Sequence, residues 1–117
     1  MIGDIWPSEK STFVDEKTGR TVHKLTAIGN NVHLYFTENS FDVNKNEIVF
    51  LSDRASGVDS PPIEETHYNL FRMDLDTGEM VQLTDEPQKV KSVTKTPDSE
   101  IIAYATNGSI RRLDTVT

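Results

Sequence analysis

Short runs of alternating apolar and polar residues recur along the chain, and polar turn residues separate one run from the next. The clearest case is residues 69–84, where the sequence Asp76-Thr77-Gly78 divides two such runs. Alternation with a period of two is typical of strands, and a glycine adopts the positive φ of a tight turn at little steric cost. We therefore expect residues 69–84 to form a β-hairpin. Its apolar positions are Leu70, Met73 and Leu75 before the turn and Met80, Val81 and Leu83 after it.

This hairpin pattern is repeated elsewhere in the chain. Residues 13–26 contain the same Thr-Gly turn and returning strand, and residues 109–115 repeat the first strand. A polar turn followed by an apolar strand also occurs twice, at residues 40–50 and 96–104. A repeat period of roughly 40–60 residues with four strands in each unit is the signature of β-propeller blades. The expected fold class is therefore all-β, with about two four-stranded antiparallel blades.

The repeats divide the chain into four parts. We expect an arm at residues 1–10, a ring-closing hairpin at 11–26, a first blade at 27–86 and an incomplete second blade at 87–117. Because each repeat buries its faces against its neighbours, about two blades cannot close a ring. We therefore expect the chain to be the N-terminal part of one propeller domain in a longer protein, or a truncated relic of one. In isolation it is expected to self-associate or to need the missing blades.

Composition narrows the class of function. The formal net charge of −7 argues against a nucleic-acid binder, which needs a basic face to neutralise phosphates. Cysteine is absent, so the chain has no disulfide framework and no thiolate site. No apolar run approaches the roughly 20 residues of a membrane span, and the first residues lack the pattern of a signal peptide. We expect a cytoplasmic protein.

Residues 31–36 alternate in the way expected of an innermost blade strand, which lines the central channel of a propeller. His33 and Tyr35 fall on one face of this strand. A His-Tyr alternation is an unusual choice for a purely structural face, so we consider a ligand-facing role for His33. The alternative, a polar histidine that is hydrogen-bonded within the core, stays open here.

The strand order also predicts which polar residues lie together. Strands run up and down within a blade, so the start of the innermost strand, the end of the second and the start of the third share one end of the ring. This places Asn31, Arg54 and His67 together, near Lys89 and Lys91 at the entry to the next blade. A convergent polar and cationic rim beside a channel is a binding-site hypothesis. Taken singly, each of these charged side chains is better explained as an exposed surface residue.

Several short motifs in this order and spacing resemble the oligogalacturonate lyase family and, more loosely, TolB-like propeller repeats. The resemblance extends from about Gly3 to Thr115. The strand at residues 31–36 favours the lyase family over the generic repeat. The motifs are the Leu25-Thr26 and Leu83-Thr84 endings, the strand Asn31 to Phe36, the corner Ser52-Asp53-Arg54 that continues to Gly57, the strand Asn69 to Leu75, and the turn Thr96-Pro97-Asp98.

The resemblance implies a seven-bladed propeller that cleaves short pectin-derived oligogalacturonides in the cytoplasm by β-elimination. It also implies a divalent metal, commonly manganese (Mn2+), that polarises the uronate carboxylate, and a histidine that acts as general base. In the family these groups come from later blades, so we expect no catalytic residue and no metal ligand in residues 1–117. A substrate-side role is carried over to the His33 strand and Arg54. The expected substrate-binding residues are His33, Arg54, Tyr35, Asn31 and His67.

Two other interpretations of the chain remain. One is a non-catalytic, TolB-like propeller module that binds a protein or a carbohydrate through its rim. The other is a purely structural segment, and we expect the isolated chain to be inactive in either case. Residues 42–47 superficially resemble the start of a calcium loop, but Glu47 occupies the position that needs glycine, so we interpret them as a turn.

Overall fold

The computed structural model describes residues 1–35, 39–42, 44–56 and 68–115. These residues form three antiparallel sheets, and helix is confined among them to the 3-10 turn η1 (Arg54–Ser56). No helix in the described part has the length and apolarity needed to cross a lipid bilayer. The expected all-β class is confirmed, while the described residues form no closed ring and the blade number stays a prediction. The strands are β1 (Ile5–Trp6), β2 (Ser11–Val14), β3 (Thr21–Lys24), β4 (Asn31–His33), β5 (Glu47–Ser52), β6 (Asn69–Asp74), β7 (Met80–Gln82), β8 (Lys91–Lys95), β9 (Ile101–Thr106) and β10 (Ser109–Asp114).

The largest sheet has five strands in the order β1-β7-β6-β5-β4. Its hairpin β6–β7 is the one that the alternation of residues 69–84 predicts, with Met73 opposite Met80. Gly78 closes the turn with φ 77°. Its amide donates to the carbonyl oxygen of Asp74 at 2.7 Å, while the Asp74 carboxylate accepts the amide of Asp76 at 2.8 Å. The turn residues therefore fix the register of the two strands.

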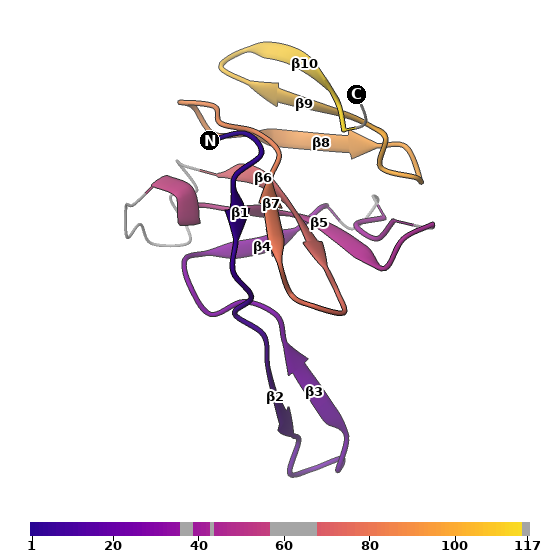
Figure 1. The fold of residues 1–117 in the computed structure, drawn as a ribbon. Coiled ribbons are helices and arrows are strands. Elements are labelled where there is room, and N and C mark those ends of the chain that lie inside the picture. The colour runs from indigo at the N-terminus through magenta and orange to yellow at the C-terminus, as the bar shows by residue number, and fades with distance from the viewer. Residues whose placement is uncertain (36–38, 43, 57–67, 116–117) are drawn as a thin grey trace.

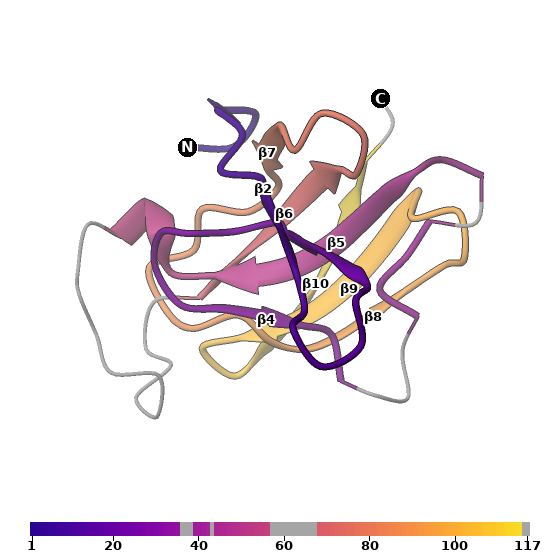
Figure 2. The same cartoon turned by 90° about the horizontal axis from the view of Figure 1, so that it is seen from below.

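The second sheet has three strands in the order β10-β9-β8, and it lies against one face of the first (Figure 1). Strands β9 and β10 pair without a break from Ser109↔Thr106 to Asp114↔Ile101. Strand β8 pairs with β9 through a bulge between Lys91 and Thr94. Strand β4 lies at one edge of the first sheet, where β5, β6 and β7 follow it in chain order, and β8 lies at one edge of the second, where β9 and β10 follow it (Figure 2).

Apolar side chains fill both faces of the five-stranded sheet. The face toward the second sheet forms a cluster with residues of β8 and β9, and the opposite face forms a cluster that Trp6 and Leu25 cover in part. Burial of such side chains contributes about 1.5–3 kcal/mol each and dominates the stability of the fold. The first cluster is Leu34, Val49, Leu70, Leu83, Val90, Val93, Ile102 and Tyr104, and the second is Phe50, Phe71, Met73 and Met80.

The N-terminal residues, expected to be an arm, add a fifth strand to the first sheet. Strand β1 pairs with β7 so that Ile5 lies opposite Val81. The Met1 ammonium group donates to Oε1 of Gln82 at 2.7 Å. The ring of Trp6 packs edge-on against Phe71, with 6.1 Å between ring centroids. Trp6 is therefore packed against the first sheet.

The hairpin β2–β3 forms a separate two-stranded sheet that projects from the body of the molecule (Figure 1). Its strands pair from Ser11↔Lys24 to Val14↔Thr21. All eight residues of the two strands are exposed, including Phe13 and Val22. The ring-closing role of this hairpin stays a prediction.

Candidate functional site

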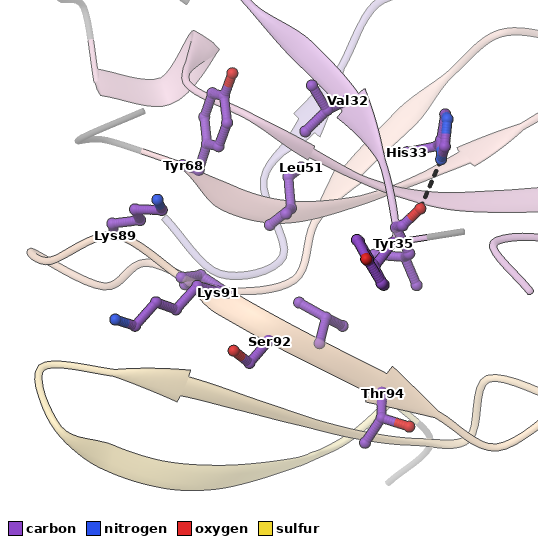
Figure 3. Close-up of a pocket in the computed structure, with 12 residues that line it drawn as sticks. Val32, His33, Tyr35, Leu51, Tyr68, Lys89, Lys91, Ser92 and Thr94 are labelled. Atoms are coloured by element: carbon purple, nitrogen blue, oxygen red, sulfur yellow. Dashed lines mark hydrogen bonds between the residues drawn. The ribbon is translucent and has the colours of Figure 1, made fainter. Parts of the chain in front are cut away.

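A groove of about 540 Å³ lies between the edge strands β4 and β8, where the two large sheets meet (Figure 3). This volume is within the usual range for small-molecule sites, roughly 300–1,000 Å³. Apolar core residues line part of it, and hydroxyl, imidazole and ammonium groups line the rest. The lining residues are Val32, His33, Leu34, Tyr35, Leu51, Tyr68, Lys89, Val90, Lys91, Ser92, Val93 and Thr94.

The imidazole of His33 is held by the backbone on one side. Its Nδ1 lies 2.6 Å from the carbonyl oxygen of Leu34. A carbonyl oxygen only accepts, so Nδ1 carries the hydrogen and donates it. Nε2 is then the acceptor of the neutral ring, or a second donor when the ring is protonated. His33 is an exposed residue, so this geometry favours a solvent-facing histidine over one satisfied within the core.

A bulge brings consecutive residues of β8 into the groove. Lys91 pairs with Ala105, but Thr94, three residues later, pairs with Ala103, only two residues away on β9. Ser92 within the bulge has φ 53°, in the left-handed region. A regular strand points alternate side chains to opposite faces, and a bulge re-aims them. All four residues from Lys91 to Thr94 therefore line the groove.

The groove differs in charge from the rest of the chain. The chain carries a formal net charge of −7, yet the described lining residues include two lysines, Lys89 and Lys91, and no Asp or Glu. The hydroxyl groups of two tyrosines, a serine and a threonine add hydrogen-bonding capacity. Such a lining suits a small hydroxylated anion: the ammonium groups attract the charge, and the exposed Tyr35 offers an aromatic ring to an apolar face.

Arg54 lies outside this lining and is buried in a polar cluster at the start of β4. Its side chain is 0% exposed. Its Nη2 donates to Oδ1 of Asn31 at 2.6 Å, its Nε donates to Oγ of Ser52 at 3.1 Å, and its Nη1 donates to the carboxylate of Glu9. The guanidinium carbon also lies 5.7 Å from the centre of the Phe71 ring. The guanidinium is thus occupied by groups of the protein itself.

Asp53 organises the loop that leads into β4. Its carboxylate accepts the backbone amide of Asn30 at 2.7 Å and the side-chain amide at 2.8 Å. Gly29 approaches so closely, with φ 73°, that a Cβ on it would lie 2.7 Å from Oδ1 of Asp53. The Asp53-Arg54 pair therefore anchors the first residues of β4 against the end of β5.

The carboxylate of Glu9 is stabilised in its ionised form. Burial alone would raise its pKa, but the amides of Ala27 and Ile28 donate to Oε1 at 2.8 and 3.0 Å, and Arg54 binds the other oxygen. Together these donors hold the pKa of Glu9 below its ordinary value. The result is an ion pair between the N-terminal segment and the first large sheet.

The structure separates the residues that the sequence placed in one site. His33 and Tyr35 line the groove, whereas Asn31 and Arg54 belong to the buried cluster, and His67 lies outside the described residues. Their roles in substrate binding stay predictions. Ser92 and Thr94 were missed, because a bulge on an edge strand leaves no mark in the alternation of the sequence.

No three His, Cys, Asp or Glu side chains in the described part of the chain are grouped so as to hold a metal ion. The described residues therefore do not fit a manganese site, and no chemical step in this segment is assigned to a metal.

Comparison with known proteins gives structural matches alone. No protein-family model and no curated protein sequence matches the chain. An oligogalacturonate lyase from Vibrio parahaemolyticus matches with a TM-score of 0.79 and 23% identity, over 99% of this chain and 29% of that one. An oligogalacturonate lyase in complex with manganese matches with a TM-score of 0.75 and 24% identity, over 97% of this chain and 28% of that one.

These matches show that the chain shares its fold with part of each of the two lyases. Both are oligogalacturonate lyases, the family that the sequence motifs resemble. The chain spans less than a third of the length of either lyase.

Proposed function

We propose that residues 1–117 belong to a β-propeller enzyme that cleaves oligogalacturonides by β-elimination. In this proposal the segment supplies scaffold and one part of the substrate rim, the groove between β4 and β8. The two large sheets are successive blades, and the hairpin β2–β3 closes the ring. Two observations support the assignment: the fold shared with two oligogalacturonate lyases, and sequence motifs in the same order and spacing.

The lining of the groove is the observation that carries the substrate assignment. An oligogalacturonide presents one carboxylate on each sugar, with hydroxyl groups around the ring. Lys89 and Lys91 are among the described lining residues, which include no Asp or Glu, and Tyr35, which lines the same groove, is an exposed residue. The ammonium groups would attract the uronate carboxylate, and the tyrosine ring would pack on the apolar face of a sugar.

The role of this segment is binding and orientation. His33, with Nδ1 donating to a backbone carbonyl, keeps Nε2 for a hydroxyl or carboxylate of the substrate. One of the two matching lyases is in complex with manganese, so we propose a divalent metal in the whole protein, where it would polarise the carboxylate. The described residues offer no place for it, and they have no assigned part in proton removal.

Binding by the groove is tested by titrating the 15N-labelled chain with trigalacturonate and following backbone amide shifts by NMR. We expect saturable shifts at His33, Tyr35 and Lys91, and none with the neutral trisaccharide maltotriose. Lys91→Glu should abolish them, while Lys17→Glu, in the exposed β2–β3 turn, should not. Equal responses to both sugars, or none to either, would refute an anionic sugar site.

Catalysis is tested on a protein that contains this segment together with the rest of the propeller. The assay follows the near-ultraviolet absorbance of the unsaturated product formed from digalacturonate in the presence of manganese. We expect turnover that a chelator removes and manganese restores. A protein that binds the sugar without turnover would instead be a non-catalytic, carbohydrate-binding propeller, the alternative function.

A further inference from the structure

We infer that Arg54 is a positioning residue for the groove. It holds Asn31, the first residue of β4, in place and so determines the position of His33 beside the groove. This inference rests on the proposed function of the groove, although its structural part is testable without a ligand. The sequence suggested that Arg54 contacts substrate directly. Its burial and its contacts point to an indirect role, in which the side chain acts through Asn31.

Arg54 joins the start of β4 to the end of β5 through a set of hydrogen bonds, called here the Arg54 clamp. Arg54 donates to Oδ1 of Asn31 at 2.6 Å and to Oγ of Ser52 at 3.1 Å. Asn31 and Ser52 are themselves register partners, at the end of the β4–β5 ladder. One side chain therefore holds both members of the pair from which β4 begins. A third bond, from Nη2 to the carbonyl oxygen of Ile28 at 3.3 Å, holds the loop before β4.

Strand β4 depends on this clamp because it is a short edge strand. Strand β4 has three residues and lies at the edge of its sheet, where β5 is its only partner strand within the described ranges. Its outer edge faces the groove, where Val32 and His33 are lining residues. A strand of this length has few ladder bonds to fix it. The buried Leu34 fixes the end of β4, and what holds Asn31 fixes its start.

An arginine side chain can form this clamp and a lysine side chain cannot. A planar guanidinium donates in several directions at once, and here it binds three segments of chain while it lies over Phe50 and Phe71. Lysine would keep the charge but supply a single nitrogen, which cannot occupy all of these positions. Arg54→Lys is therefore a conservative variant that removes the clamp without removing the charge.

Glu9 completes the clamp from outside the sheet. Its carboxylate pairs with Arg54, and 9% of its side chain is exposed. Because Ala27 and Ile28 also donate to it, Glu9 links the N-terminal segment to the loop before β4. Glu9→Gln keeps an acceptor for these amides and removes the charge, so it should loosen the clamp less than a change at Arg54.

The test compares Arg54→Lys and Glu9→Gln with Arg72→Lys in the full chain. Arg72 is the matched control, because it pairs with Glu47 at 2.9 Å on the same sheet and does not line the groove. Two properties are measured below the unfolding temperature of every variant: the amide shifts and hydrogen exchange of residues 31–34 without ligand, and the affinity for trigalacturonate. Far-ultraviolet circular dichroism confirms folding.

We expect Arg54→Lys to change the shifts and speed the exchange of residues 31–34, and to weaken trigalacturonate binding by about five-fold, as the loss of one hydrogen-bonded contact would. Glu9→Gln should give smaller changes in the same residues, and Arg72→Lys should give none. If Arg54→Lys fails to fold, Glu9→Gln carries the test. Folded variants whose residues 31–34 and affinity match the parent would overturn the inference.

The two proposals fail in different ways. If the parent chain does not bind trigalacturonate, the proposed function fails. The amide shifts and hydrogen exchange of residues 31–34 without ligand then test the inference. Changes in Arg54→Lys that are absent in Arg72→Lys support the positioning role, and shifts and exchange rates equal to those of the parent refute it.

Discussion

Gly78, at the β6–β7 turn, lies so close to Ser8 that a Cβ on the glycine would come within 2.2 Å of the serine Oγ. The contact joins the N-terminal segment to a turn seventy residues later. It is reinforced by Lys10, whose Nζ donates to the carbonyl oxygen of Leu75 at 3.2 Å. The glycine thus serves two purposes, a left-handed turn and a docking surface for the segment that carries Glu9.

Gly78→Ala is expected to destabilise the chain more than the same change at Gly19, its counterpart in the first hairpin. Both glycines have a positive φ, so alanine costs about 1 kcal/mol at each. At Gly19 no described atom lies within 4 Å of the added Cβ, whereas at Gly78 it meets Ser8. The total at Gly78 should be about 2 kcal/mol. Urea unfolding of both variants measures the difference.

A second substitution shows whether the contact with Ser8 is the cause. Ser8→Ala removes the hydroxyl that the new Cβ would meet, so the double variant should recover part of the loss at Gly78. Equal losses at the two glycines, or no recovery in the double variant, would mean that the turn conformation alone sets the effect.

Stability should fall in acid partly because of Glu9. Its pKa is lower in the folded chain than in the unfolded chain, since two amides and Arg54 favour the carboxylate. A lowered pKa contributes stability that is present above the unfolded value of 4.5 and is lost as pH falls through the folded value. We therefore expect the free energy of unfolding to decrease from about pH 5 downward.

Glu9→Gln removes this contribution. The variant should be less stable than the parent at pH 7 and should have a shallower pH dependence below pH 5, so that the two curves converge in acid. Glu16→Gln, in the exposed β2–β3 turn, is the control and should leave the curve close to the parent's. If the free energies of unfolding of Glu9→Gln and the parent decrease in parallel below pH 5, Glu9 is not the group whose protonation lowers stability.

Ser92 should tolerate glycine and resist a β-branched residue. It has φ 53° within the β8 bulge, where a branched side chain is strained. Ser92→Val should destabilise the chain by about 1–2 kcal/mol, and Ser92→Gly should be neutral or stabilising. Thr94→Val, in the regular part of β8, is the control. Thermal unfolding distinguishes the three, and a Ser92→Val variant as stable as the parent would contradict the bulge.

The bulge also shows where sequence reasoning reached its limit. Alternation located β6, β7 and β9 to within a residue or two, because buried positions recur along each of them. Strand β10 has no buried residue and was predicted because residues 109–115 repeat the first strand of the 69–84 hairpin. The sequence placed Lys89 and Lys91 at the entry to the next blade, and nothing in the order of residues 91–95 revealed that β8 has one residue more than the stretch of β9 that it pairs with. The sequence therefore did not predict that Ser92 and Thr94 line the groove.

The division of the expected site has a similar physical cause. Sequence reasoning placed Asn31 and Arg54 at the correct end of their strands, and they do meet. The buried Arg54 also pairs with Glu9, 45 residues before it, which lies in the segment between β1 and β2. An ion pair between residues so far apart leaves no periodic pattern in the sequence. The sequence alone therefore could not distinguish a buried arginine from one that contacts substrate.

The exposed hairpin β2–β3 predicts how the isolated chain behaves in solution. Phe13, Val14 and Val22 are exposed on it, and its two strands pair only with each other among the described residues. Exposed apolar side chains on a short sheet with free edges favour association. We expect the chain to form concentration-dependent oligomers, and Phe13→Lys to shift them toward monomer in sedimentation velocity. Ile110→Lys, on the exposed edge strand β10, tests another sheet edge. Relief by Ile110→Lys alone would assign the association to the second sheet instead of the hairpin.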